Sequence, residues 1–289
     1  MFTGKGGVGK TTLSSASALF FSQKYKVLLV STDPSGSLKE IFGIDFGEGV
    51  KRVKESLDVV ELTRDTVLRL WREKFGDEVY TVISSFFPVK EEILDYIEGA
   101  PGIDMEFMLD YVLTALKSGK YDLIIWDTAP TASILSLLQV QYMFYSHLTQ
   151  AQRVYLKIKS FIKQVDPLSL IEKWRKLTAE IIDMLKNDTS AWIVSTPEKL
   201  PVEQALFLAK ALQEFGIEVK GFILNKVLEE GICSECEFLE KKRKTQKKWI
   251  NYLLNQAKFP VKVVYEFTED PTNETFLSQI SQTLYERVY

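Results

Sequence analysis

The fold is decided by the stretch Gly4-Lys5-Gly6-Gly7-Val8-Gly9-Lys10-Thr11-Thr12, near the start of the chain. Its spacing of Gly, four residues, Gly, Lys and Thr is the Walker A pattern of phosphate-binding loops. The glycines allow backbone N–H groups to turn inward toward phosphate oxygens, and a following helix adds the partial positive charge of its N-terminus. We therefore expect the whole stretch to bind a nucleotide, with Lys10 at the β- and γ-phosphates and the Thr11 hydroxyl on Mg²⁺.

Short apolar runs rich in β-branched residues alternate with longer segments of helical pattern. They are segments 26–31, 59–62, 123–127, 191–195, 221–225 and 261–265. Near-continuous hydrophobicity in runs of this length indicates strands that are buried on both faces. Helical patterns follow the loop at 12–23 and recur at 201–215, where Gly216 provides a stop. The sequence thus predicts an α/β fold, a P-loop NTPase with a mainly parallel sheet covered by helices.

Two segments between apolar runs are too long to be single crossovers. They lie at about 64–120 and 131–187, and their pattern is mostly helical. The phosphate-loop motif occurs once, and no internal repeat is evident. We therefore expect residues 1–289 to form a single P-loop ATPase domain whose helical subdomain is built from these two insertions.

The composition limits the class of protein. A hydrophobic content of 46% in 289 residues is enough for a sizeable core. The net charge of −3 argues against nucleic acid as a general partner. Two cysteines in a chain of this length favour a reducing compartment, so we expect a cytoplasmic protein. No signal peptide and no purely apolar run long enough to span a membrane is expected.

Two aspartates follow apolar runs, Asp33 after segment 26–31 and Asp127 at the end of segment 123–127. Ligands of open parallel sheets bind at the carboxyl ends of strands, so both carboxylates should converge on the phosphate loop. Asp127 is the candidate that holds Mg²⁺, directly or through water. Asp33 is the candidate that orients or activates the attacking water, and it joins Lys10 as a catalytic candidate. The alternative for either aspartate is a helix cap or a turn residue.

The second lysine of the loop, Lys5, gives the motif the form Lys-Gly-Gly-x-Gly-Lys-Thr. This form resembles the deviant Walker A of dimeric ATPases that include partitioning and cell-division ATPases, nitrogenase iron protein, arsenite-pump ATPases and targeting ATPases for tail-anchored membrane proteins. The resemblance implies a homodimer in which Lys5 reaches the other subunit's nucleotide and stabilises transferred charge in trans. The alternative is an ordinary solvated lysine.

Further phrases narrow the resemblance to the arsenite-pump and tail-anchored-protein targeting family. Ser31-Thr-Asp-Pro-Ser-Gly-Ser-Leu38 and Asp127-Thr-Ala-Pro-Thr131 are similar to its switches I and II. Phe86–Pro88 with Ala100–Asp104 is similar to its first helical insertion, and Gly221–Asn225 to the strand that presents an asparagine to adenine. Cys233-Ser-Glu-Cys236 before a basic helix is similar to the CxxC segment of the targeting ATPases. Relatives often carry histidine at the place of Gly36, and Gly-His at the places of Ala132 and Ser133. The resemblance implies that Asn225 contacts adenine; its alternative is a residue that only ends a strand.

Cys233 and Cys236 supply two thiolates at zinc-ligand spacing. Two ligands do not close a tetrahedral structural site, but a two-fold dimer would bring four thiolates together. A zinc ion shared across the dimer is therefore expected, at about half an equivalent per chain. A redox-active dithiol and unliganded thiols are the alternatives.

Residues 128–152 contain no Asp, Glu, Lys or Arg. In the targeting ATPases an apolar helical groove holds the transmembrane helix of a client, and amphipathic grooves bind helices elsewhere. Candidate lining residues are Leu137, Leu138, Met143, Phe144, Phe161 and Ile162. The alternative is an ordinary buried helix. The basic stretch 241–248 is expected to be a solvated helix face, with an acidic partner or a membrane surface as alternatives.

The motifs predict a Mg²⁺-dependent ATPase, and the family resemblance implies that it acts as a nucleotide-gated homodimer and targets tail-anchored membrane proteins. Its partners would be a second copy, the hydrophobic transmembrane segment of a client and a membrane receptor. One alternative is the subunit that energises an arsenite efflux pump. Another is a positioning ATPase that binds DNA or membrane, which net acidity and the lack of a clear amphipathic anchor disfavour.

Overall fold

The computed structural model describes residues 1–33, 37–47, 49–86, 90–98, 103–158, 168–231, 233, 235–267 and 274–285. The chain forms two compact units. The ATPase unit comprises Met1–Glu61, Gly119–Ile134 and Thr189–Tyr289, and the helical unit comprises Leu62–Ser118 and Leu135–Asp188. The two segments of the helical unit overlap the insertions expected at about 64–120 and 131–187.

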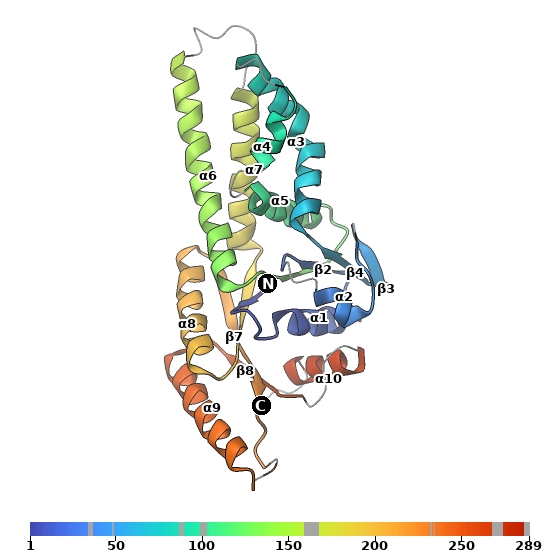
Figure 1. Ribbon diagram of the computed structural model, residues 1–289, viewed down its shortest axis with the longest axis vertical. Coiled ribbons are helices and arrows are strands. Elements are labelled where there is room, and N and C mark those ends of the chain that lie inside the picture. The colour runs from blue at the N-terminus through green and yellow to red at the C-terminus, as the bar shows by residue number, and fades with distance from the viewer. Residues whose placement is uncertain are drawn as a thin grey trace. The chain divides into compact units, whose positions relative to one another are not determined.

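The described part of the ATPase unit is built on an eight-stranded sheet of order β3-β4-β2-β5-β1-β6-β7-β8 (Figure 1). Every neighbouring pair is parallel except β3 and β4. The strands are β1 Phe2–Gly4, β2 Val27–Ser31, β3 Lys51–Lys54, β4 Leu57–Glu61, β5 Leu123–Asp127, β6 Ser190–Ser195, β7 Glu218–Val227 and β8 Val261–Tyr265. The central strands are almost wholly buried, as their apolar runs predict, so the α/β fold with a mainly parallel sheet is confirmed.

Sequence reasoning missed the edge strand β3. Its residues Lys51–Lys54 are mostly exposed and charged, and it pairs antiparallel to β4 with an irregular register. Charged side chains on a short edge strand block further strand pairing, but they also hide the strand from a search for apolar runs. β1 has only three residues, all of them buried between β5 and β6.

The helices of the ATPase unit cover both faces of its sheet. They are α1 Lys10–Phe21, α2 Ser37–Phe42, α8 Lys199–Glu214, α9 Glu237–Gln256 and α10 Glu274–Tyr285. The crossovers from β1 to β2 and from β6 to β7 run in opposite directions along the sheet, and right-handed crossovers then place α1 and α8 on opposite faces. α1 packs on β2 and α10, whereas α8 packs on β6, β7 and α9. The direction reverses beside β1, where open parallel sheets bind their ligands.

The predicted helix ends are close to those observed. α1 starts two residues before the expected 12–23, and α8 spans Lys199–Glu214 instead of 201–215. Gly216 ends α8 as expected, with a φ of 82° and its N–H donated to the Gln213 carbonyl at 2.9 Å.

The helical unit packs its helices around aromatic side chains. Its elements are α3 Arg64–Phe86, α4 Ile93–Glu98, α5 Ile103–Lys117, α7 Leu168–Asn187 and the part of α6 Thr131–Ile158 that follows Ile134. Phe75 of α3 lies 5.1 Å from Phe107 of α5 and 6.0 Å from Trp174 of α7, measured between ring centroids. Trp174 also contacts Phe144 of α6 at 5.9 Å, so one aromatic cluster connects four helices.

Candidate functional site

The loop between β1 and α1 needs glycine at two positions where other groups come very close. Gly4 has a φ of 150°, and a Cβ there would lie 2.2 Å from the Val194 carbonyl oxygen. Gly9 is the N-cap of α1 with a φ of 94°, and a Cβ there would lie 2.3 Å from the Asn225 amide nitrogen. Steric clash and the positive φ therefore exclude any residue other than glycine at positions 4 and 9. The loop is therefore held tightly at both ends, while Gly6 and Gly7 at its tip are exposed.

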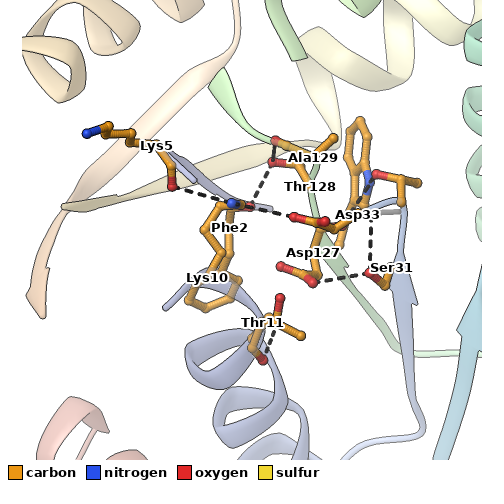
Figure 2. Close-up of polar contacts among 12 residues, drawn as sticks. Phe2, Lys5, Lys10, Thr11, Ser31, Asp33, Asp127, Thr128 and Ala129 are labelled. Carbon is orange, nitrogen blue, oxygen red and sulfur yellow. Dashed lines mark hydrogen bonds and ion pairs between the residues drawn. The ribbon is translucent and has the colours of Figure 1, made fainter. Parts of the chain in front are cut away.

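Lys10 is the first residue of α1 and is 96% buried. Its ammonium lies 3.7 Å from an Asp33 carboxylate oxygen and 3.5 Å from the Lys5 carbonyl oxygen (Figure 2). A buried ammonium held by one carboxylate and one backbone oxygen is a fixed positive charge inside the loop. The predicted convergence of Lys10 and Asp33 is present in the geometry.

Asp127 ends β5 and is fully buried. The Ser31 hydroxyl donates to its Oδ2 at 3.2 Å, whereas its Oδ1 has no hydrogen-bond partner among the described residues. Burial raises the pKa of Asp127 to about 6, against the opposing effects of the Thr11 hydroxyl and the Lys10 charge, which both lie beside it (Figure 2). Thr11 and Asp127 thus present two oxygens together, and the unpaired carboxylate oxygen suits a hard cation such as Mg²⁺.

Strand register brings the two aspartates together. Ser31 is opposite Asp127 in the β2–β5 ladder, and the Ser31 hydroxyl also accepts the Asp33 N–H at 3.3 Å. Thr32 fixes the same edge, because its N–H reaches the Asp127 carbonyl at 3.0 Å and its hydroxyl accepts the Trp126 indole N–H at 3.0 Å. Sequence reasoning missed Ser31 as the residue that joins the Asp127 carboxylate to the Asp33 backbone; a serine that ends an apolar run is the signal.

Glu61 is a third carboxylate at this edge that sequence reasoning missed. It ends β4 directly opposite Ser31, and its Oε1 is buried without a partner among the described residues. Burial, the first cause, and the negative charges of Asp45 and Asp33 raise the pKa of Glu61, while the Leu38 N–H lowers it. A glutamate inside the apolar run 59–62 is the signal for such a group.

The remaining loop residues differ in exposure. Lys5 is half-buried, and Figure 2 shows its side chain directed away from Lys10 and both aspartates. Val8 is buried, and Thr12 is half-buried in the first turn of α1. The Lys5 ammonium is therefore not aimed at the phosphate site of its own chain.

Asn225 lies near the end of β7 and is 92% buried. Its amide nitrogen donates to the Val8 carbonyl at 2.9 Å, so its side chain faces the loop backbone. The predicted base-contacting residue thus belongs to the loop's immediate surroundings.

The two cysteines lie just before the start of α9. Cys236 is the half-buried N-cap of that helix, and its N–H donates to the carbonyl of the exposed Cys233 at 3.1 Å. In the parts of the chain that the structure describes, no three His, Cys, Asp or Glu side chains gather as a metal site. One chain therefore offers two sulfur ligands, half the set that a structural zinc ion requires.

The candidate groove residues have mixed environments. Leu137 and Leu138 are buried, Phe144 packs on Trp174, and the Met143 side chain is 57% exposed. Phe161 and Ile162 lie outside the described residues, as do Gly36 and part of the switch I and insertion phrases. Among the helices described, none combines the length and hydropathy that a membrane span requires.

Comparison with known proteins agrees with the geometry. A family model described as "Anion-transporting ATPase" matches residues 1–286. "Putative arsenical pump-driving ATPase 2" of Aquifex aeolicus is 32% identical over 274 residues, which cover 90% of this chain and 91% of that protein. "Putative arsenical pump-driving ATPase 1" of the same organism is 28% identical over 99% of this chain and 78% of that protein. "ATPase ASNA1 homolog 1" of Paramecium tetraurelia is 28% identical over 87% of this chain and 81% of that protein.

These matches confirm the resemblance that the loop and the switch phrases predict. The family model spans nearly the whole chain, and the first relative exceeds 30% identity over almost its full length. The chain therefore belongs to the anion-transporting ATPase family, and it is an ATP hydrolase.

Proposed function

We propose that this ATPase is a cytoplasmic, nucleotide-gated homodimer that targets tail-anchored membrane proteins. The observation that carries the proposal is the geometry of the loop: Lys10 converges with Asp33, while Lys5 is directed away from both. A loop lysine turned away from its own site fits a contact with the nucleotide of a second subunit. Relatives named as ASNA1 homologues support the targeting role.

The proposed roles at the phosphate site follow from position and charge. Backbone N–H groups of the loop and Lys10 would bind the phosphates, and Thr11 with Asp127 would hold Mg²⁺, which neutralises phosphate charge when bound. Asp33 lies 3.7 Å from Lys10 at the edge of the phosphate loop, and from this position its carboxylate would orient the attacking water molecule. Asn225 would contact the base from the side of the loop that its amide already faces.

A subunit-mixing experiment tests the trans role of Lys5. Lys5→Ala and Asp33→Asn should each strongly reduce ATP hydrolysis when assayed alone. In a mixed dimer, one site would receive Asp33 from one subunit and Lys5 from the other. Partial recovery of activity on mixing is the expected result, and its absence would contradict a trans role.

The client site is proposed in the helical unit. Leu137 and Leu138 are buried in the described packing, so a groove that includes them requires the helices of this unit to separate. We expect ATP with Mg²⁺ to favour the client-binding form and hydrolysis to release the switches and the client, as in order–disorder transitions. A membrane receptor is a further expected partner.

Client capture can be measured by pull-down. A substrate with a C-terminal hydrophobic helix should be retained with a non-hydrolysable ATP analogue and released with ADP. The control is the same substrate with two lysines placed in that helix. Equal capture of both substrates, or capture without nucleotide dependence, would count against the targeting role.

A zinc ion shared between the Cys233–Cys236 pairs of two chains would join the dimer. Elemental analysis should find about half an equivalent of zinc per chain, and Cys233→Ser should lower both zinc content and dimer stability. Stable dimers without zinc would contradict this part of the proposal.

An arsenite-driven role is the second candidate, because the relative at 32% identity is named an arsenical pump-driving ATPase. Cys233 and Cys236 are close enough in sequence to bind a soft trivalent metalloid together. Arsenite would then stimulate ATP hydrolysis, and Cys236→Ser would remove the stimulation. Hydrolysis that is indifferent to arsenite would dismiss this candidate.

A further inference from the structure

The Asn225 side chain lies directly against the backbone of the phosphate loop. The Asn225 amide donates to the Val8 carbonyl at 2.9 Å, and it occupies the space that a side chain at position 9 would need. Because Gly9 is the N-cap of α1, the amide touches the backbone at the point where the loop becomes a helix. A displacement of Asn225 would therefore change the loop that binds phosphate.

The residue after Asn225 has a strained backbone. Lys226 has a φ of 60°, in the left-handed region that side chains other than glycine rarely adopt. The register between β7 and β8 shifts in the same place, between Leu224 and Val227. Asn225 thus stands on an irregular strand end, and its position depends on whatever stabilises that irregularity.

Gln246 of α9 stabilises this irregular strand end through both the nitrogen and the oxygen of its side-chain amide. Its side-chain nitrogen donates to the Lys226 carbonyl at 3.0 Å, and its side-chain oxygen accepts the Leu228 N–H at 2.9 Å. The side chain is 96% buried, although its neighbours Thr245 and Lys247 on the helix are exposed. A buried amide with both of its ends bonded to backbone is a specific clasp, and losing either bond leaves a buried polar group unpaired.

We propose that Gln246 is a positioning residue for nucleotide binding: its amide holds the strand end at Lys226 and thereby sets the Asn225 amide against the phosphate loop. Helix α9 can then regulate nucleotide binding. A ligand that binds near Cys236 or the basic stretch 241–248 and shifts the helix would shift Gln246 as well. Linkage requires the reverse effect, so nucleotide binding must also change the affinity of α9 for any ligand whose binding shifts this helix. The inference rests on the proposal that the loop holds the nucleotide, which Lys10→Ala tests separately.

Gln246→Glu tests the clasp with one atom changed. The carboxylate can still accept the Leu228 N–H, but it cannot donate to the Lys226 carbonyl unless it is protonated. At about pH 8 the dissociation constant for a non-hydrolysable ATP analogue with Mg²⁺ should rise about fivefold, the effect of one lost hydrogen bond. At about pH 5.5 the ratio of variant to wild-type constants should fall toward one, since burial favours the protonated glutamic acid. Taking the ratio removes the titration of Asp127 that both proteins share.

Asn251→Asp is the matched control, because it makes the same chemical change at an exposed position of α9. It should bind the analogue as the wild type does at both pH values. If Gln246→Glu also binds like the wild type at about pH 8, or if its deficit does not recover at low pH, the proposal is wrong.

A double-mutant cycle shows whether Gln246 acts through Asn225. Gln246→Glu should weaken binding much less in an Asn225→Ala background than in the wild type, whereas additive effects would overturn the proposal. Lys226→Gly offers a second test in a chain with less backbone strain. Gln246→Ala should cost less affinity in that background than in the wild type, and an equal cost would contradict the clasp.

Discussion

The tryptophans of the two units have different surroundings. In the ATPase unit, the Trp126 indole N–H donates to the Thr32 hydroxyl, which the register of β2 and β5 brings within reach. In the helical unit, the indole nitrogens of Trp71 and Trp174 are buried, and no hydrogen-bond acceptor is found for them among the described residues. Strand register thus supplies the Trp126 indole with an acceptor, whereas the described packing of the helical unit supplies none to the indoles of Trp71 and Trp174.

Gln141 extends this contrast. It is fully buried in α6, and both its amide oxygen and its amide nitrogen are without partners among the described residues. An unpaired buried polar group costs about 1–3 kcal/mol. In the ATPase unit, Asp127 Oδ1 also has no partner in the described part of the chain, but it lies beside Thr11 and Lys10 where Mg²⁺ is expected. The position of Asp127 Oδ1 therefore suits a ligand, whereas the unpaired Gln141 amide marks a place where the packing of the helical unit can be improved or opened.

The largest expected effect is on chemistry in the ATPase unit. Lys10→Ala removes the buried positive charge of the loop and should lower kcat for ATP hydrolysis about a hundredfold or more. Lys24→Ala, at an exposed position after α1, should leave kcat unchanged. A Lys10→Ala enzyme that kept a tenth of the wild-type rate would show that the nucleotide is not processed at this loop.

Asp127→Asn should separate activity from stability. The folded pKa of about 6 exceeds the ordinary value of 3.8, so the ionised carboxylate is disfavoured in the fold. Its contribution to stability is full below pH 3.8 and is lost as pH rises through about 6. Without nucleotide, the variant should match the wild type at low pH and exceed its unfolding free energy by up to ~3 kcal/mol above about pH 7. Denaturant titrations across this range measure the difference.

The same substitution should reverse its effect when Mg²⁺ and ATP analogue are present. The wild type gains stability from the ligand in proportion to its affinity, and Asp127→Asn loses most of that gain. Its ATP hydrolysis should be nearly abolished. A variant that is less stable than the wild type in both conditions would contradict the reading of Asp127 as a group held for a cation.

Gln141→Leu tests the helical unit. Replacing the unpaired amide by an apolar side chain of similar size should raise the free energy of unfolding by about 1–3 kcal/mol. Gln139→Leu, at an exposed position on the same helix, should change it by less than about 0.5 kcal/mol. Equal effects of the two variants in urea titrations would show that the Gln141 amide is already satisfied.

Much of the ATPase unit could be predicted because its signals are local. The Gly4–Thr12 spacing specified the loop, and apolar runs specified the buried strands together with Asp33 and Asp127 at their ends. β3 escaped because an exposed edge strand needs charge rather than hydrophobicity. Ser31 escaped because its importance depends on register with Asp127, which only strand pairing defines. Glu61 depends on register in the same way.

The helical unit was less predictable for a physical reason. A helical pattern predicts that apolar residues such as Leu137 and Met143 share faces of a helix. It does not predict which neighbouring element covers each face. In the structure Leu137 is buried and Met143 is exposed, and the sequence treats both as equal groove candidates. The Gln246 clasp was equally hidden, because a glutamine among lysines in a basic helix resembles one more solvated residue.

Thr32→Val gives the smallest expected effect, and it gives the ATPase unit a tryptophan without an acceptor, like those of the helical unit. It removes the hydroxyl acceptor and leaves the Trp126 indole N–H buried and unpaired, which is the state of the Trp71 and Trp174 indoles among the described residues. The free energy of unfolding should fall by about 1–2 kcal/mol, the cost of one orphaned buried donor. Thr32→Ser keeps the acceptor and should recover most of the loss, apart from the missing methyl group. If valine is tolerated as well as serine in urea titrations, the indole bond contributes nothing to the ATPase unit. The paired and unpaired tryptophans would then no longer distinguish the two units.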